Sequence, residues 1–172
     1  MIYLQSPDKT QIAVFQNENQ IGAGFIDWIK LTDKEITAYL LQEAKNNKLT
    51  ELNKFYSSAE CWTYTVFTSI NQYASLTRDA DFFAKLLPAC GGRQIQIFTD
   101  NNVIVNYNLT VEKASNLNYQ INIVNGTLLK AKKIDLENKI NLANNIDDIN
   151  NIDYKQEFLS AVLRNINLDL IK

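Results

Sequence analysis

Short runs of alternating apolar and polar residues dominate the first 30 residues of the chain. Ile12 and Val14 fall on one side of a predicted strand, and Ala13 falls on the other. Three such runs, at 1–5, 11–16 and 24–30, are separated by residues with the proline and Asx chemistry that closes turns. The alternation predicts a small N-terminal β-meander.

From residue 31 the apolar positions recur at steps of three and four. Thr32 and Glu35 have the spacing of a capping box, which marks the start of a helix. The steps continue to Tyr56, and Ser57 follows as a stop. The pattern predicts a connecting helix over residues 31–57, either as one helix of about 24 residues or as two halves bent at Asn46 and Asn47.

The middle of the chain favours short strands. Residues 61–70 are aromatic and β-branched, which is typical of a strand, and residues 93–107 read as a hairpin with its turn at 99–102. Between them, the spacing over 71–87 predicts two short helices interrupted at 77–81.

The C-terminal third carries helical patterns. The first begins near Thr110 and predicts one core-facing stripe: Leu117, Ile121, Val124, Leu128 and Ala131. A second steps through Leu136, Ile140, Ala143, Ile146, Ile149 and Ile152. A last helix is predicted from the apolar residues between 158 and 166.

These elements predict an α+β fold. We expect an N-terminal β element at 1–30, a connecting helix at 31–57, and a mixed α+β module with a hairpin and C-terminal helices at 58–172. A chain of 172 residues is long enough to bury a core, and 46% hydrophobic with 21% charged residues is normal for a globular protein.

Charge and composition exclude several classes of partner and catalytic site. The formal net charge of −2 gives no basic footprint, so we expect no nucleic-acid partner. The absence of histidine excludes Ser-His-Asp and Cys-His catalysis and histidine-bearing zinc sites. Cys61 and Cys90 lack CxxC spacing, and we interpret them as buried thiols in a reducing compartment, with a disulfide as the alternative.

Several segments rich in Asp and Asn are candidates for a metal or catalytic site. Asp100 with its neighbours, and residues 144–153, lack the glycine and glutamate of a calcium loop, and the isoleucines in the second segment favour a solvated helix. A hydrolase without histidine could use Asp79, Asp81 and Asp100, but acidic pairs in polar linkers are usually only solvated. We expect no catalytic residue, no metal and no cofactor.

Four aromatic residues are the candidate contact site. Flat amphipathic rings bind sugar faces and anchor protein partners, although a core role is the alternative for each of them. The candidates for partner or ligand contact are Trp28, Tyr56, Trp62 and Tyr64.

The sequence offers no export or membrane signal. The N-terminus has neither a basic region nor an apolar one, and no run approaches the roughly 18 apolar residues of a spanning helix. We therefore expect neither secretion nor membrane insertion.

Several segments carry a family resemblance. Residues 28–36 and 43–49 resemble the polar helices that precede C-terminal modules of tailed-phage tail-fibre and tail-fibre-assembly proteins. Residues 50–153 resemble an uncharacterised domain family of such prophage proteins, through the hairpin at 97–103, the helix opening at 109–112 and the segment 139–149.

The resemblance implies a phage-derived structural or assembly role without catalytic residues. Its implied partner is a phage tail component, with homo-oligomerisation as a further expectation. The implied location is the bacterial cytoplasm during assembly, with the virion as the later site. The alternative function is a carbohydrate- or surface-binding module that uses exposed aromatic residues.

Overall fold

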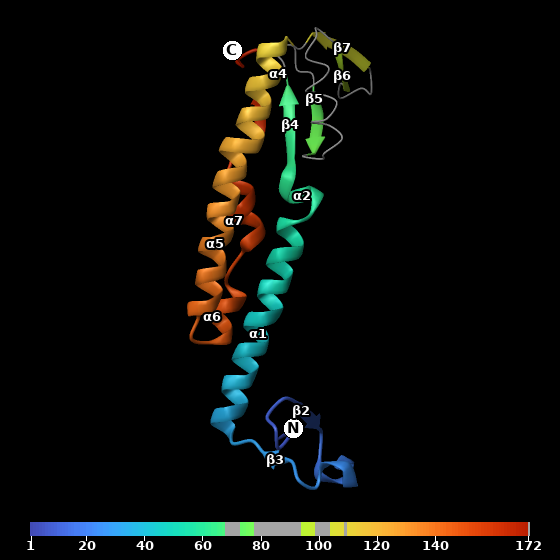
Figure 1. The fold of residues 1–172 in the computed structure, drawn as a ribbon, viewed down its shortest axis with the longest axis vertical. Coiled ribbons are helices and arrows are strands. Elements are labelled where there is room, and N and C mark those ends of the chain that lie inside the picture. Colours follow the sequence, from blue (N-terminus) through green and yellow to red (C-terminus); the bar gives the residue numbers. More distant parts are fainter. Residues whose placement is uncertain (68–72, 78–93, 99–103, 109, 172) are drawn as a thin grey trace.

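The structure is a computed structural model that describes residues 1–67, 73–77, 94–98, 104–108 and 110–171. The fold is α+β, as predicted. A small sheet lies at one end of an elongated molecule, one long helix leads away from it, and a helical body with short strands forms the rest (Figure 1).

The N-terminal sheet is not a meander. Strands β1 (Ile2–Gln5) and β2 (Ile12–Phe15) form the predicted hairpin, but β3 (Ile29–Lys30) pairs with β1, so the order is β2-β1-β3. Two 3₁₀ turns, η1 (Glu18–Gln20) and η2 (Ala23–Phe25), lie in the connection between β2 and β3. The third predicted strand is therefore shorter than residues 24–30.

Helix α1 (Asp33–Tyr56) is one uninterrupted helix of 24 residues, so the two-halves alternative is wrong. The capping box forms as predicted: the Thr32 hydroxyl accepts from the Glu35 N–H at 3.4 Å, and the Glu35 carboxylate accepts from the Thr32 N–H at 2.8 Å. These bonds satisfy backbone donors that a bare helix start would leave unpaired. The helix stops at Ser57, as expected.

Two ends of α1 pack against different parts of the molecule. Near its start, the ring of Tyr39 lies 6.2 Å from that of Tyr3 on the sheet. Near its end, Phe55 packs against Phe158, with ring centroids 5.8 Å apart. Only Leu52 and Phe55 of α1 are fully buried, so the helix joins the main core through its second half.

A second sheet follows α1, and here some predictions fail. Ser58 caps a single helical turn, α2 (Ala59–Trp62), so the predicted strand begins two residues later, as β4 (Thr63–Phe67). Residues predicted as helical form β5 (Tyr73–Thr77), which pairs antiparallel with β4. Its helical pattern is overridden by this cross-strand pairing. The remaining parts of that prediction, 71–72 and 78–87, lie outside the described residues, as does the end of the predicted strand at 68–70.

The predicted hairpin is confirmed in its two strands. Strands β6 (Gln94–Phe98) and β7 (Ile104–Asn108) are antiparallel, and Ile97 pairs with Val105. The predicted turn at 99–102 lies outside the described residues.

The helix after the hairpin contains a π-helical segment. Thr110 caps α4 (Val111–Asn118), η4 (Tyr119–Asn125) is π-helical, and α5 (Gly126–Leu142) continues as α-helix. Because i→i+5 bonding takes up roughly one more residue per turn, the buried positions shift by one residue. Asn125 and Leu129 are buried, whereas Leu128 is 46% exposed and Ala131 is exposed. The predicted stripe is therefore wrong at Leu128 and Ala131.

The last predicted helix is also shorter than expected. Asn145 caps α6 (Ile146–Asn150), and α7 (Tyr154–Ser160) ends well before residue 166. The chain then forms β8 (Asn165–Asn167), which pairs in parallel with β4. Ile166 is buried there as a strand residue.

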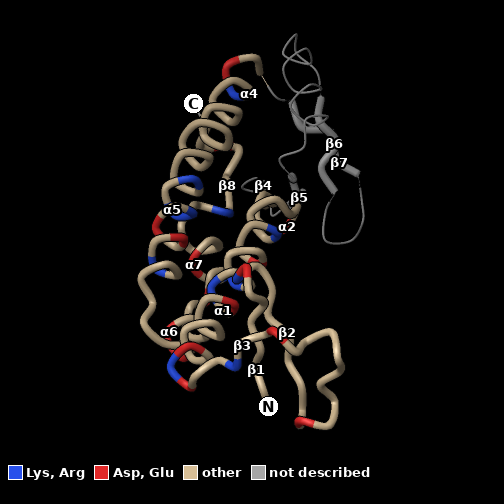
Figure 2. The backbone as a smooth tube through the Cα atoms, turned by 60° about the horizontal axis from the view of Figure 1, so that its bottom comes forward, with Lys and Arg blue, Asp and Glu red and all other residues tan. Residues whose placement is uncertain are grey.

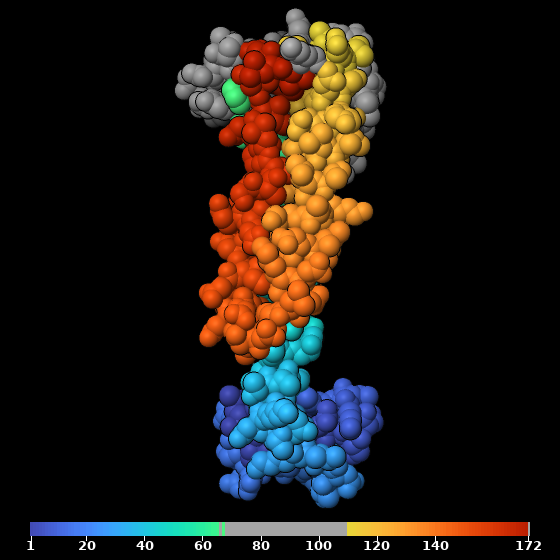
Figure 3. Space-filling model, turned by 90° about the vertical axis from the view of Figure 1, so that its left-hand side faces the viewer, coloured from blue at the N-terminus to red at the C-terminus, as the bar shows by residue number. Residues whose placement is uncertain are grey.

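One main core unites α1, α2, α4, η4, α5, α7, β4 and β8. Its members are Leu52, Phe55, Cys61, Tyr64, Leu117, Ile121, Leu129, Leu136, Ile140, Phe158, Val162, Ile166 and Leu168. The N-terminal sheet lies outside this core and buries its own Tyr3, Leu4 and Leu31. Between the two, α1 forms a narrow waist (Figure 3). The expected domain boundaries at 30 and 57 stay a prediction.

Candidate functional site

Trp28 lies in the N-terminal unit, which we define as residues 1–31. Its ring is half-buried and meets that of Phe25 edge-on at 4.8 Å, while Phe25 meets Phe15 at 5.0 Å. The three rings link strand β2 to the connection that leads into β3. Trp28 thus has a packing role and keeps part of its surface open.

Tyr56 and Trp62 form a pair at the far end of α1. Their ring centroids are 5.4 Å apart at 69°, and the indole Nε1 donates to the Tyr56 carbonyl at 2.6 Å. The Lys133 Nζ lies 5.4 Å from the centre of the Tyr56 ring. The indole donor and the tyrosine ring are therefore engaged within the chain, because the Tyr56 ring also lies 5.7 Å from that of Phe158.

Tyr64 lies in the core, because only 1% of its surface is exposed. The guanidinium carbon of Arg164 lies 5.3 Å from the centre of its ring. Arg164 also donates to the carbonyls of Cys61 at 2.6 Å, Thr63 at 3.2 Å and Phe158 at 3.1 Å. Arg164 thus ties α2, β4 and α7 together beneath Tyr64, a role that the sequence pattern did not indicate.

The four aromatic candidates do not form one surface. Trp28 precedes α1, whereas Tyr56 and Trp62 lie at its end, and 24 helical residues at about 1.5 Å each separate them by roughly 36 Å. The structure brings Tyr56 and Trp62 together and leaves Trp28 apart. A single sugar platform built from all four residues is not present.

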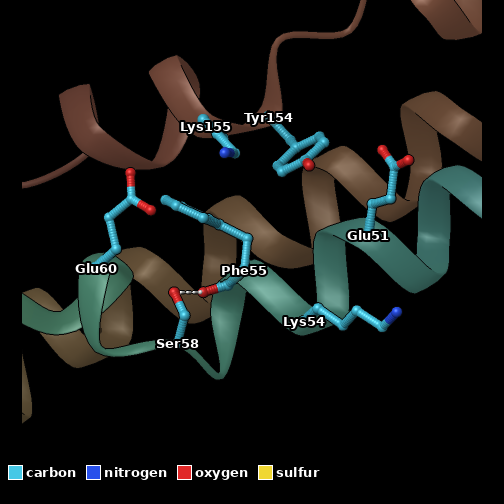
Figure 4. Close-up of a pocket in the computed structure, with 7 residues that line it drawn as sticks. All are labelled: Glu51, Lys54, Phe55, Ser58, Glu60, Tyr154 and Lys155. Atoms are coloured by element: carbon cyan, nitrogen blue, oxygen red, sulfur yellow. Dashed lines mark hydrogen bonds between the residues drawn. The ribbon is translucent and has the colours of Figure 1, made fainter.

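A shallow hollow of about 290 Å³ lies beside the end of α1 (Figure 4). It is lined by Glu51, Lys54, Phe55, Ser58, Glu60, Tyr154 and Lys155. Burial, with a contribution from Glu51, raises the pKa of Tyr154 above its usual value, which is the opposite of the shift that would activate a phenol. The Ser58 hydroxyl donates to the Phe55 carbonyl at 2.6 Å and accepts from the Cys61 N–H at 3.4 Å, which is a helix cap and not an activated nucleophile.

A more apolar hollow of about 320 Å³ lies where α1 leaves the helical body. Its walls are Thr37, Leu40, Leu41, Asn144, Asn145, Ile146 and Asp147. Nearby, the Lys45 Nζ donates to the Asn141 carbonyl at 2.8 Å and fastens α1 to the end of α5. Leu40 and Leu41 are half-buried here.

Charged side chains of α5 and α7 pair with each other. Lys132 reaches Asp135 and Glu157 at 3.3 Å, and Lys139 reaches Glu157 at 3.0 Å. The Lys132 hydrogen bond lowers the pKa of Asp135, and the Glu157 hydrogen bond raises that of Lys139. Charges of both signs lie along α5 (Figure 2). These groups fasten two helices and have no feature of an acid–base pair poised for catalysis.

The candidate metal and acid segments give no such site in the part of the chain that is described. No group of three or more Asp, Glu or Cys side chains converges there. The segment 144–153 contains helix α6, and the Asn145 side chain caps it by accepting from the Asp148 N–H at 2.8 Å. Asp79, Asp81 and Asp100 lie outside the described residues.

The two remaining expectations concern cysteine and the membrane. Cys61 is a buried free thiol, as we expected for it, and burial raises its pKa. Cys90, the other half of the alternative disulfide, lies outside the described residues. Across the described ranges, none of the helices has the length and apolar content to cross a bilayer.

Comparisons of the chain with protein-family models, with curated proteins and with solved structures gave no match.

Proposed function

We propose that this chain is a structural or assembly component of a phage or prophage tail, as a fibre part or as its assembly chaperone, and that it acts through protein contacts. The observation that carries the proposal is its shape. The N-terminal unit stands away from the helical body on α1, with a narrow waist between them (Figure 3). Such a layout suits a part that holds two contact surfaces apart.

The N-terminal unit presents apolar side chains to solvent. Ile26 is 80% exposed, Ile29 is 56% exposed and Val14 is 47% exposed. Large aliphatic side chains on one small unit are typical of a contact surface, since water leaves them favourably on binding. We assign this unit the contact with the tail component.

The helical body supplies a rigid base for that contact. The second half of α1 is fixed by Phe55 against Phe158 and by the Lys45 bond to the end of α5. A continuous helix that is anchored at one end keeps the N-terminal unit at a fixed distance from the helical body, which favours a spacer role.

A carbohydrate- or surface-binding function has less support. It would use Trp28, Tyr56, Trp62 and Tyr64, yet Tyr64 is buried and Trp28 lies about 36 Å from the Tyr56–Trp62 pair along α1. Only the pair could form a local ring platform, and part of that pair is engaged within the chain.

Affinity purification from cells that produce the tail tests the proposal. A tagged full chain should retain a tail component during assembly in the bacterial cytoplasm, and mass spectrometry of purified particles shows whether it stays in the virion. A glycan-array response together with no retained tail component would favour the carbohydrate alternative. Genes for baseplate and fibre proteins on either side of its gene would support the tail role, whereas a metabolic operon would contradict it.

A further inference from the structure

Hydrogen bonds along β1 fix which backbone groups of the sheet face outward. The Ser6 N–H donates to the Gln11 carbonyl at 3.0 Å, and the Leu31 N–H donates to the Tyr3 carbonyl at 2.9 Å. In antiparallel pairs, hydrogen-bonded and non-hydrogen-bonded positions alternate. The two bonds agree on the same alternating pattern along β1. The backbone N–H and C=O groups of Leu4 point toward Ala13 of β2, and those of Tyr3 point toward β3.

Ile12 and Val14 therefore direct their N–H and C=O groups away from β1, along the outer edge of β2. No described strand pairs with that edge. The flanking donors are already used: the Thr10 N–H donates to Asp8 Oδ1 at 3.1 Å, and the Gln16 N–H donates to Gln20 Oε1 at 2.9 Å. The free edge is thus a short stretch centred on Ala13.

The two edges of this sheet are protected differently. Strand β3 has only two residues, and one is Lys30, which pairs with Glu18 at 3.8 Å. Charged and very short edge strands resist addition of another strand. The β2 edge lacks these devices, because residues 10–17 contain no charged residue and no proline, and Val14 is 47% exposed.

We propose that a second copy of this chain pairs antiparallel with β2, with the two-fold axis at Ala13. Ile12 of each copy then hydrogen-bonds with Val14 of the other, and the two three-stranded sheets become one continuous sheet. A second copy fits because the edge is self-complementary and uncharged. An axis at Val14 or at Ile12 would instead require the Gln16 or the Thr10 N–H, which are already bonded.

Helix α1 does not obstruct this pairing. It contacts the sheet through Tyr39 against Tyr3 of β1, the central strand. In the dimer the two β1 strands are three strand spacings apart, or about 14 Å. Helices of about 10–12 Å diameter fit side by side at that separation. The dimer proposal depends only on the N-terminal sheet, so it is independent of the proposed contact with a tail component.

Sedimentation of the full chain over a wide concentration range tests for the dimer. Val14→Lys places a charge on the free edge of both copies, and should move the monomer–dimer midpoint to at least about tenfold higher concentration. Ile29→Lys is the matched control, because it changes a comparably exposed isoleucine on the opposite edge and should leave the midpoint in place. A monomer at every concentration, or equal shifts for both variants, would overturn the proposal.

Cysteine cross-linking tests the register independently of affinity. In a Cys90→Ala background the remaining native thiol, Cys61, is buried. Ala13→Cys places two thiols on the axis, at a non-hydrogen-bonded pair where the Cα atoms are about 4.5 Å apart, within disulfide range. Gln11→Cys places them well beyond that range. A dimeric disulfide with Ala13→Cys alone supports the register, and equal or no cross-linking of the two variants contradicts it.

Discussion

Adjacent leucines in α5 give a direct test of the π-helical segment. In a regular helix Leu128 would face the core in line with Leu117 and Ile121, but the extra residue taken up by η4 puts Leu129 there instead. Leu129→Ala removes three buried carbons, worth about 2.4 kcal/mol at about 0.8 each. With the cavity left behind, the loss of unfolding free energy should reach about 3–5 kcal/mol.

Leu128→Ala removes the same atoms from a residue that is 46% exposed. Only roughly half of the transfer free energy is lost and no closed cavity forms, so the unfolding free energy should fall by about 1 kcal/mol. Urea unfolding followed by far-UV circular dichroism gives both values, provided that the slope of the transition is unchanged. Equal losses, or a larger loss at Leu128, would show that the helix keeps α-helical register through residues 119–125.

Four further predictions concern polar contacts and are measured by the same unfolding assay. Thr32→Ala should cost about 1 kcal/mol, because it removes the cap of α1. The Thr32 hydrogen bonds hold the pKa of Glu35 below its usual value, so the ionised Glu35 stabilises the fold at neutral pH and this stabilisation is lost as the pH falls through the lowered pKa. The unfolding free energies of Glu35→Gln and the native chain should therefore differ at pH 7 and converge in acid. A difference that stays constant with pH would contradict this. Arg164→Lys should cost about 2 kcal/mol, because an ammonium cannot reach all three carbonyls, and a neutral result would show that one contact suffices. Asn125→Asp should cost about 3 kcal/mol, since it buries a charge and removes the donor to the Leu163 carbonyl, and an unchanged midpoint would refute that bond.

Local chemistry made some elements predictable. The capping box at Thr32 and Glu35 depends only on residues three apart, and it forms as expected. The β6–β7 hairpin is likewise encoded by two nearby β-favouring runs. In each case the partners are close in sequence, so no distant segment has to be known.

Elements that depend on distant partners were missed. Residues 165–167 form β8 because β4, about 100 positions earlier, offers a parallel edge. β3 joins β1 and not β2 for the same kind of reason. The π-helical segment leaves no periodicity of its own, and the burial of Asn125 and Leu129 shows that the register has changed. Asn125 accepts from Gln120 and donates to the Leu163 carbonyl.

The candidate site was predictable in residue type but not in arrangement. Tyr56 and Trp62 were candidates because of their residue type alone, and the structure shows that their rings pair. Trp28 is far from the Tyr56–Trp62 pair because α1 is one unbroken helix. The sequence did not decide this, because Asn46 and Asn47 also allowed a bend. The exposed Ile26 and Ile29 flank Trp28 in the sequence, yet a single sequence does not distinguish an exposed isoleucine from a buried one.

The central claim is that the N-terminal unit carries the contact with a tail component. Its most direct test compares Ile26→Lys with Leu170→Lys, which changes a similarly exposed residue near the other end of the molecule. The measurement is the amount of tail component retained by each tagged protein from tail-producing cells. The account predicts that the native chain and Leu170→Lys retain it equally and that Ile26→Lys loses it. Equal retention by all three proteins, or no retention by any of them, would contradict it.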